Sequence, residues 1–476
     1  MLFNSVEFGV FFIVVFGLYF ALRHKHSWQN RLLLVASYIF YGFWDWRFLS
    51  LILISTVMDY FCGIKISEAN EPERRKKFLF LSVFINLLIL GFFKYFGFFT
   101  SSMASLLSLF GFSIQPYLLN IILPVGISFY TFQTMSYTID IYRKQLEPTR
   151  NFFDYALFVS FFPQLVAGPI ERAKHLLPQV ISARELSLEK FYEGCYLIFW
   201  GLFLKVFIAD NLATIVNPVF AADAPYNGAR VLIATYAFTF QIFCDFAGYS
   251  NIARGLGKCM GFDIMVNFNL PYFAKNPSEF WQRWHISLSS WIRDYLYIPL
   301  GGNRKGARRT HINLLLAMLL GGLWHGAAWT FIIWGAYHAL LLQAHRLLKP
   351  ILDRIHFNNI FTAKMWTVIQ MAIFFHLVCL GWLIFRAQSI TQAYNMLIAV
   401  FTNFQLYGAG LVHTVTRVVF YVGVLLVVEI FQYRRNDLMV IQKGNIWIRA
   451  LFYCICFYLI IMYGAGGGQE FIYFQF

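Results

Sequence analysis

Long apolar runs without charged side chains constrain the fold of this chain more than any other feature. One such run, residues 312–342, reads INLLLAMLLGGLWHGAAWTFIIWGAYHALLL and holds no Asp, Glu, Lys or Arg. At about 1.5 Å per residue, an α-helix of this length crosses a bilayer. A segment inside hydrocarbon must satisfy its own backbone hydrogen bonds, which a helix does. The sequence therefore predicts an all-α polytopic membrane protein.

The composition supports the same class and excludes others. Of the 476 residues 59% are hydrophobic and only 13% are charged, whereas soluble domains average about 25% charged residues. The net charge is +15, but the Lys and Arg residues lie mostly in short connections between apolar runs, as membrane topology requires. A nucleic-acid binder would gather them on one soluble face. No nucleic-acid partner is expected.

The apolar runs follow each other with little between them, which predicts one membrane domain over residues 1–476, with a motif-rich core at 240–345. We expect about 11–13 membrane helices or re-entrant segments, since some runs are too short or too polar to cross fully. The predicted segments are 6–22, 32–46, 48–66, 78–99, 117–141, 152–169, 190–220, 229–256, 312–342, 364–386, 390–404, 409–433 and 446–464.

The basic residues between these segments predict the orientation. Clusters at 23–31, 74–77 and 143–150 are all cytoplasmic if the N-terminus is outside and the path alternates. The same rule places the basic residues at 434–449 inside. The last segment then delivers the tail, residues 465–476, to the extracytoplasmic face, so both termini are predicted to be extracytoplasmic.

Two histidines lie inside the run at 312–342. His325 is near its middle, between Trp324 and Gly326, and an ionisable side chain at that depth indicates function more often than a satisfied structural role. His338 follows thirteen residues later, about 220° around a straight helix. The two rings should face different sides unless Gly326 or Gly335 bends the run.

A second histidine-bearing segment precedes this run. Apolar residues spaced three or four apart predict one amphipathic helix at the interface or beside a water-filled cavity. His285 lies within it, where a solvated surface histidine and a functional one are both possible. The apolar face consists of Trp281, Trp284, Leu288, Trp291 and Tyr295.

Other polar or helix-breaking residues interrupt the apolar pattern. Pro163 and Gly168 in FFPQLVAGPIER predict a broken or re-entrant segment near Gly168, or else a kinked structural helix. Asp245 lies in apolar surroundings and needs a basic partner, for which Arg254 or an arginine of 283–293 is available. An ion-pair role is favoured for Asp245 over a catalytic one.

The remaining residue pattern favours acyl transfer. No metal-ligand spacing is present, so no metal site is expected, and hydrolase and nucleotide-binding motifs are absent. A buried histidine can act as general base for transfer of an activated acyl group to a hydroxyl. A basic turn could hold the phosphates of a thioester carrier arriving from the cytoplasm. These predicted donor-binding residues are Arg304, Lys305, Arg308 and Arg309.

Two stretches, EFWQRWHISLSSWIRDYLYIPLGGNR (279–304) and LWHGAAWTFIIWGAYH (323–338), carry a family resemblance. Together with FFPQLVAGPIER, CDFAGYSNIARGLG and NFNLPYF, they resemble the bacterial alginate O-acetyltransferase branch of the membrane-bound O-acyltransferases. The resemblance covers nearly the whole chain. It implies helices around a central tunnel, residence in the bacterial inner membrane, and acetyl-CoA or another acyl thioester as donor substrate with no bound cofactor. The implied activity is O-acetylation of an exported polysaccharide such as alginate.

The resemblance also assigns roles to individual residues. His325 stands where the family has its essential histidine, and His285, forty residues earlier, stands where many members have a second polar residue, often Asn. The family motif DFSGYSD reads DFAGYSN here, so Asn251 cannot act as an acid, although Asp245 remains.

The ending FIYFQF, residues 471–476, is similar to the FxYxxF ending of teichoic-acid D-alanylation systems, where the tyrosine is thought to carry the acyl group. Our hypothesis is a relay in which His325, helped by His285, activates the phenol of Tyr473. Tyr473 would accept acetyl and pass it to an extracytoplasmic acetyltransferase partner of the SGNH type. The alternative is an aromatic anchor at the interface.

Two other functions remain open at this point. The same fold could move a D-alanyl group from a carrier protein to a cell-wall polymer. From a different class, the protein could transport an acyl or lipid substrate without catalysing a reaction. Retained acyl transfer after His325→Ala would favour the transporter.

Overall fold

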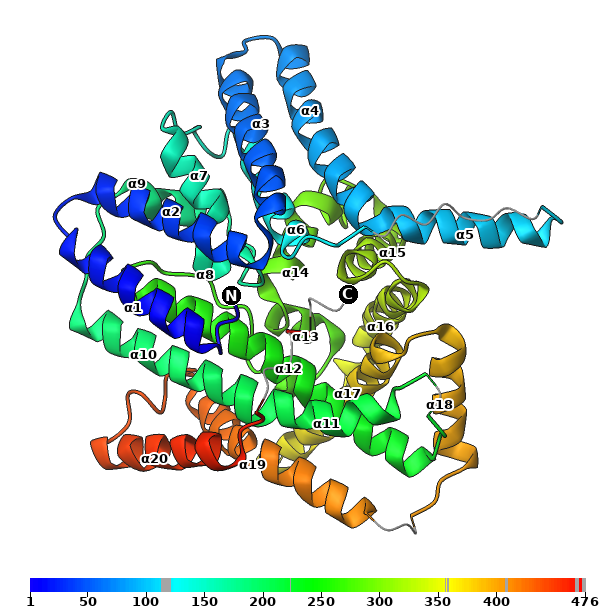
Figure 1. Cartoon of the computed structure of the whole chain (residues 1–476). Helices are drawn as coiled ribbons and strands as arrows, with labels where there is room; N and C mark the ends of the chain where they lie inside the picture. Colours follow the sequence, from blue (N-terminus) through cyan, green and yellow to red (C-terminus); the bar gives the residue numbers. More distant parts are fainter. Residues whose placement is uncertain are drawn as a thin grey trace. The chain divides into compact units, whose positions relative to one another are not determined.

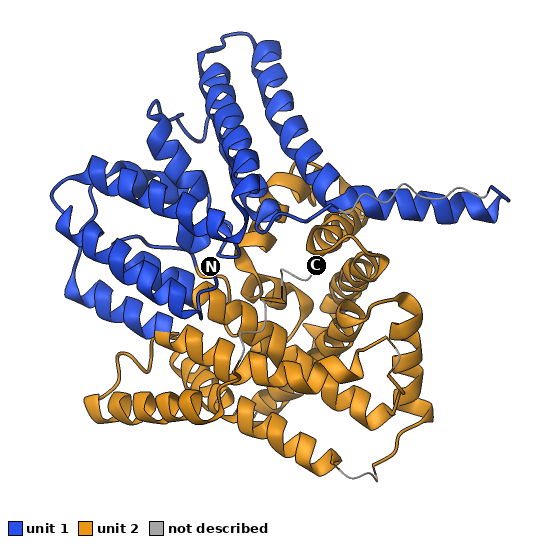
Figure 2. Cartoon of the chain, in the orientation of Figure 1, with its two compact units in different colours: residues 1–198, 252–265 blue, residues 199–251, 266–476 orange. Residues whose placement is uncertain are grey.

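The computed structural model describes residues 1–112, 121–222, 224–355, 357, 359–406, 410–466 and 471–472 (Figure 1). Within these ranges the chain is helical and contains no β-strand. It divides into two compact units, residues 1–198 with 252–265 and residues 199–251 with 266–476 (Figure 2). Two of the boundaries between the units fall inside helices, namely α10 (Leu188–Leu202) and α12 (Gly228–Cys259). That residues 1–476 form one membrane domain stays a prediction.

Apart from α10 and α12, the described part of the chain has nine α-helices in the first unit and nine in the second. The first unit holds α1 (Val6–Ala21), α2 (His26–Asp45), α3 (Leu49–Glu68), α4 (Pro72–Leu90), α5 (Phe96–Leu109), α6 (Ile127–Tyr142), α7 (Phe152–Ser160), α8 (Phe162–Leu165) and α9 (Ala173–Ile181). The second holds α11 (Asp210–Val219), α13 (Pro277–Arg283), α14 (Ile286–Ile292), α15 (Gly306–His325), α16 (Trp329–Leu352), α17 (Ile360–Arg386), α18 (Ile390–Thr402), α19 (Leu411–Arg435) and α20 (Ile446–Tyr463).

Seven helical stretches among the described residues are long and apolar enough to cross a membrane. Their number and composition confirm the prediction of an all-α, multi-pass membrane protein. They are His26–Glu68, Pro72–Leu109, Leu188–Val219, Gly228–Cys259, Ile360–Arg386, Leu411–Arg435 and Ile446–Tyr463.

The segment predicted at 152–169 is broken into two helices, as the first of its two interpretations, a broken or re-entrant segment, required. Helix α7 has nine residues, about 14 Å at helical rise, and α8 has four. Gly168 then lies so close to Gln164 that a Cβ would overlap the Gln164 backbone. Neither helix is long enough to cross a bilayer.

Buried polar side chains join three helices in the interior of the first unit. Asp59 on α3 accepts hydrogen bonds from Ser82 Oγ (2.6 Å) and Asn86 Nδ2 (2.8 Å) on α4. Ser82 also pairs with Thr138 Oγ1 on α6 at 2.9 Å. The Asp59 carboxylate is therefore satisfied by neutral donors, and these hydrogen bonds hold α3, α4 and α6 together.

The run at 312–342 does not form the single helix that its composition predicted. Helix α15 ends at His325, the backbone is extended at Gly326 and Ala328, and α16 begins at Trp329. The two helices pack side by side (Figure 1). Cβ atoms on Gly322 and Gly335 would overlap carbonyl oxygens of the opposite helix, so both positions need glycine for this close approach. Small residues therefore convert one long run into a helical hairpin.

Candidate active site

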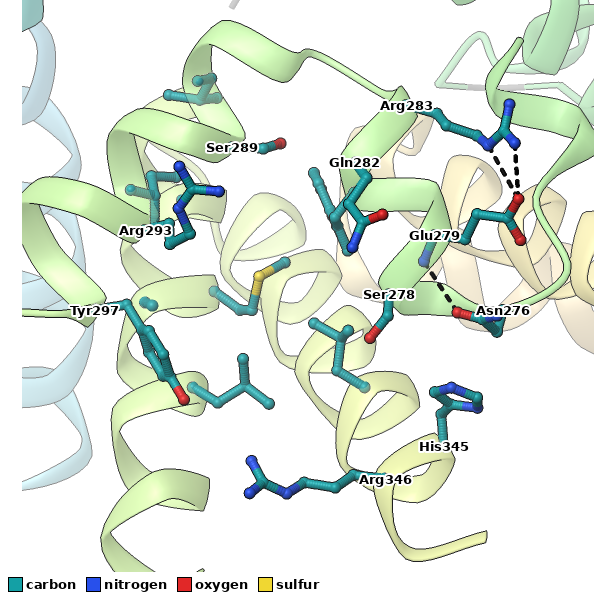
Figure 3. A pocket seen from close by; sticks show the side chains of 18 of the residues that line it. Asn276, Ser278, Glu279, Gln282, Arg283, Ser289, Arg293, Tyr297, His345 and Arg346 are labelled. Atoms are coloured by element: carbon teal, nitrogen blue, oxygen red, sulfur yellow. Dashed lines mark hydrogen bonds and ion pairs between the residues drawn. The ribbon is translucent and has the colours of Figure 1, made fainter. Parts of the chain in front are cut away.

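A cavity of about 980 Å³ lies in the second unit, among α13, α14, α15 and α16 (Figure 3). The residues that α15 contributes recur at helical spacing and so form one face. They are Leu314, Ala317, Met318, Gly321 and His325. A second set, Leu342, His345, Arg346 and Lys349, lies at spacing i, i+3, i+4 and i+7 on α16. The cavity thus follows directly from the hairpin that the glycines allow.

His325 is the last residue of α15 and lines this cavity, with 3% of its surface exposed. Three aromatic side chains enclose its imidazole. The ring centres of Trp334, Trp324 and Phe385 lie 5.0, 5.1 and 5.5 Å from that of His325. Its position at the end of a helix, against rigid aromatic rings, holds the imidazole at the cavity wall. This placement agrees with the role predicted for His325, which stays a prediction.

His285 is buried, and the single continuous helix expected around it is wrong, although residues of this segment do line the cavity, as the second of the two predicted settings required. The segment breaks into α13 and α14, with His285 between them in a left-handed backbone conformation (φ 42°, ψ 55°). Asn267 explains the break. Its backbone oxygen accepts the Ile286 N–H (2.9 Å), and its side chain accepts the Ser287 N–H (3.2 Å) and hydroxyl (2.9 Å). These bonds take the donors that a continuous helix would use.

The two predicted catalytic histidines lie together. Their ring centres are 6.2 Å apart at an interplanar angle of 57°. Trp324 contacts both, since its ring centre is 5.6 Å from His285 and 5.1 Å from His325. Phe246 on α12 covers another side of His285 at 4.6 Å. The structure therefore brings His285 and His325 into one aromatic-walled site.

His338 is also buried, but it does not line the cavity. Its ring stacks on Phe280 at 5.9 Å and an angle of 6°, and it contacts Trp281 at 5.1 Å and Trp334 at 4.7 Å. Neither ring nitrogen has a hydrogen-bond partner among the described residues. Because the run breaks at Gly326, His325 and His338 contact the same Trp334 instead of facing different sides. The contacts of His338 are those of an aromatic core residue.

The basic residues that line the cavity differ from those predicted to bind the donor. Arg304, Lys305, Arg308 and Arg309 are exposed, and none of them is among the described lining residues. Arg346 and Lys349 come instead from the last turns of α16, and Arg293 follows α14. Figure 3 labels Arg293 and Arg346 at the cavity. Lys349 pairs with Asp353 and Arg293 with Asp294, whereas Arg346 makes no ion pair with a described residue. The helical spacing from Leu342 to Lys349 in the sequence would have identified Arg346 and Lys349 as residues of one helix face.

Asp245 is paired, but the predicted partners were wrong. Lys205 Nζ lies 2.7 Å from Asp245 Oδ1 and 2.9 Å from Asp210 Oδ1. Lys205 belongs to a π-helical turn, Phe203–Ala209, which sequence patterns do not reveal. Arg254 lies nine residues further along α12, about 180° around the helix from Asp245, and so faces away.

The other Asp245 oxygen binds the C-terminal segment. The backbone N–H of Ile472 donates to Asp245 Oδ2 at 2.6 Å. Tyr473, the predicted acyl carrier, lies outside the described residues, although its neighbours Phe471 and Ile472 are described and buried.

The described residues thus form a helical, multi-pass membrane protein with a buried histidine pair and a cavity lined by one of the two histidines. The sequence profile of the membrane-bound O-acyltransferase family matches residues 143–382, and the chain belongs to that family. It is an acyltransferase, as the motifs predicted.

Individual relatives agree with this assignment. A probable alginate O-acetylase, AlgI, of Pseudomonas putida is 45% identical over 84% of this chain and 80% of its own length. The peptidoglycan O-acetyltransferase of Helicobacter pylori is 36% identical over 83% of this chain and 79% of its own. The teichoic acid D-alanyltransferase of Bacillus subtilis is 30% identical over 63% of this chain and 82% of its own.

Proposed function

We propose that this protein O-acetylates an exported polysaccharide, with alginate as the first candidate, from the bacterial inner membrane. The observation that carries the proposal is the position of His325 in the wall of a 980 Å³ cavity that also holds basic side chains. The similarity to alginate O-acetylases, at 45% identity, supports the substrate class. The D-alanyltransferase relatives are less identical and match a smaller share of this chain, which favours an acetyl over a D-alanyl group.

The donor in this proposal is acetyl-CoA or a related thioester. Ligand cavities of about 300–1,000 Å³ hold drug-sized molecules, and this cavity lies at the upper end of that range. Arg346 and Lys349 would bind the donor's phosphates by charge-assisted hydrogen bonds. Arg304, Lys305, Arg308 and Arg309 would draw the donor in from the cytoplasm by charge.

His325 is the general base in the proposed reaction, with Tyr473 as acceptor. As the phenol oxygen of Tyr473 attacks the thioester carbonyl, His325 takes the phenol proton. The tetrahedral intermediate collapses by breaking the carbon–sulfur bond, and the leaving thiolate receives that proton. The products are O-acetyl-tyrosine and the free thiol. His285, whose ring lies 6.2 Å from that of His325, would orient the reacting groups.

A second transfer completes the proposed cycle outside the membrane. With both termini extracytoplasmic, a partner acetyltransferase of the SGNH type would take acetyl from Tyr473 and place it on a polysaccharide hydroxyl. The phenol regains a proton from that hydroxyl, so the carrier is restored. The outward transfer needs no nucleic-acid or metal component.

The proposal is tested with the purified full-length protein in lipid vesicles and acetyl-CoA labelled in the acetyl group. We expect label to appear in the C-terminal peptide, as one acetyl mass in a tryptic digest, and to be absent from His325→Ala. Exposed His413 in the same unit provides the matched control, His413→Ala, which should label normally. If label appears only when the donor is a D-alanyl carrier thioester, the transferred group is D-alanyl and not acetyl. If the donor crosses the vesicle membrane unreacted, the protein is a transporter.

A further inference from the structure

The buried charges around Lys205 form a site that the catalytic proposal does not use. Lys205, Asp210 and Asp245 have side chains that are 9%, 2% and 4% exposed. One ammonium group contacts two carboxyl groups here, so this is not a simple ion pair. A buried charge of this kind costs free energy unless each oxygen is hydrogen-bonded. The remaining Asp245 oxygen is satisfied by the Ile472 N–H, at 2.6 Å.

Aromatic contacts on α12 hold the residue before Ile472. The Phe471 ring lies 4.8 Å from Tyr249 and 5.7 Å from Phe246, and Phe471 is buried. Tyr249 follows Phe246 by three residues and Asp245 by four, so on α12 it is a neighbour of both side chains. A main-chain hydrogen bond with an adjacent side-chain pocket is a common mode of peptide recognition.

The chain is also held upstream of this point. Asn211 Nδ2 donates to the Tyr463 carbonyl oxygen at 2.8 Å, at the end of α20, and the Ala465 N–H donates to the Val206 carbonyl oxygen at 3.3 Å. The elements that hold residues 463–465 are therefore the same π-helical turn and α11 that supply Lys205 and Asp210. The C-terminal segment is therefore held at two described points of the second unit, residues 463–465 and 471–472.

The docked residues share an aromatic neighbour with the histidines. The Phe246 ring lies 5.7 Å from Phe471 and 4.6 Å from His285, and His285 lies 6.2 Å from His325. Phe246 thus contacts both the docked segment and the candidate active site. Tyr473 is joined to Ile472 by one peptide bond.

We infer that Asp245, fixed by Lys205, is a docking site for the chain's own C-terminal segment, and that both are positioning residues for the acyl acceptor. Lys205 neutralises and orients Asp245, which leaves one oxygen free to accept the Ile472 N–H. Phe471 sets the register against Tyr249 and Phe246. The consequence for catalysis rests on the proposed acetyl transfer, whereas the docking itself does not.

Docking is tested by carboxypeptidase digestion of the full-length protein in detergent, followed by intact-mass measurement. In the wild type, digestion should not pass Ile472, because Phe471 and Ile472 are buried. Asp245→Asn removes the charge-assisted hydrogen bond and should speed digestion past Phe471 about tenfold or more. Asp210→Asn is the matched control, since it alters Lys205 but leaves Asp245 in place, and it should remain protected. Equal protection in Asp245→Asn, or equal exposure in Asp210→Asn, would overturn the inference.

A second pair of variants separates docking from chemistry. Ile472→Pro deletes the N–H donor, and Ile472→Val keeps it with a similar side chain. We expect Ile472→Pro to transfer acetyl about tenfold or more slowly than Ile472→Val, with the same melting temperature. If the proposed acetyl transfer is wrong, neither variant is active but the digestion pattern of the Asp245 and Asp210 variants persists. If docking is wrong, the two Ile472 variants transfer acetyl equally.

Discussion

The imidazole rings of His285 and His325 lie 6.2 Å apart, and the indole of Trp324 contacts both. His325 ends one helix, while His285 lies in the break between two others. Their relative position therefore depends on two chain interruptions, at His285 and at Gly326, and not on a regular helix face. Each interruption can be tested separately from the chemistry.

Replacing His325 by Ala should lower acetyl transfer by about 10²–10⁴-fold, the usual contribution of a general base. The protein should still elute as wild type on size exclusion, because the imidazole borders a cavity and its loss leaves the surrounding aromatic rings in place. His413→Ala should retain wild-type activity, since His413 is exposed and away from the cavity. Wild-type transfer by His325→Ala would remove His325 from the mechanism.

The left-handed backbone at His285 predicts how substitutions there behave. Asn tolerates this conformation better than most residues, whereas a β-branched side chain is strained by about 1–3 kcal/mol. His285→Asn should therefore fold and keep partial activity, and His285→Val should show a lower melting temperature and little transfer. Equal melting temperatures of the two variants would show that the φ of 42° does not matter for stability.

The basic residues of the cavity and the exposed basic residues at 304–309 lead to different predictions for the KM of the donor. If the cavity residues bind its phosphates, Arg346→Ala should raise KM for acetyl-CoA about tenfold and leave kcat nearly unchanged. Arg308→Ala, in the exposed first turn of α15, removes only a long-range attraction that salt screens, so it should change KM less than Arg346→Ala at physiological salt. Steady-state kinetics on both variants decides between the groups, and a larger effect of Arg308→Ala would favour the turn predicted from sequence.

The sequence predicted the helical class and singled out His325 because apolar composition and a histidine near the middle of an uncharged run carry direct physical meaning. It named Gly326 as a possible bend but did not predict that the run breaks at 326–328. Gly322 and Gly335 show their role only when the two helices lie together, and a run of 31 residues without charge is equally consistent with one span. Composition alone cannot distinguish a long helix from a tight hairpin.

The environments of His285 and Asp245 were missed for a related reason. Asn267 interrupts the helix at His285 from eighteen residues upstream, and Lys205 reaches Asp245 from forty residues upstream through a π-helical turn. Both are long-range contacts that periodicity does not report. By contrast, Arg346 and Lys349 share a helix face with Leu342, so the cavity's basic end could have been found from spacing.

Close helix packing makes Gly335 sensitive to any side chain. A Cβ there would overlap the Met318 carbonyl oxygen, so Gly335→Ala should destabilise the protein by about 1–3 kcal/mol. At Gly423 in α19 an added methyl group would have no described atom within 4 Å, and Gly423→Ala should be neutral or slightly stabilising. Thermal unfolding in detergent measures both. Equal melting temperatures would mean that α15 and α16 can separate without cost.

The ion pair of His175 and Glu171 gives stability a pH dependence in the first unit. His175 Nδ1 lies 2.7 Å from Glu171 Oε2, and this hydrogen bond raises the pKa of His175, with a smaller contribution from Asp263. Both residues of the pair lie between the segments predicted to cross the membrane.

Because the folded pKa of His175 is raised, the interaction stabilises fully below the unfolded pKa of about 6.5 and is lost as pH rises through the folded value. His175→Gln should therefore lower the melting temperature at pH 5.5 and leave it close to wild type at pH 8.5. His24→Gln, which alters an exposed histidine of the same unit, should show no such trend. A melting-temperature difference between His175→Gln and the wild type that grows with pH would contradict the ion pair with Glu171.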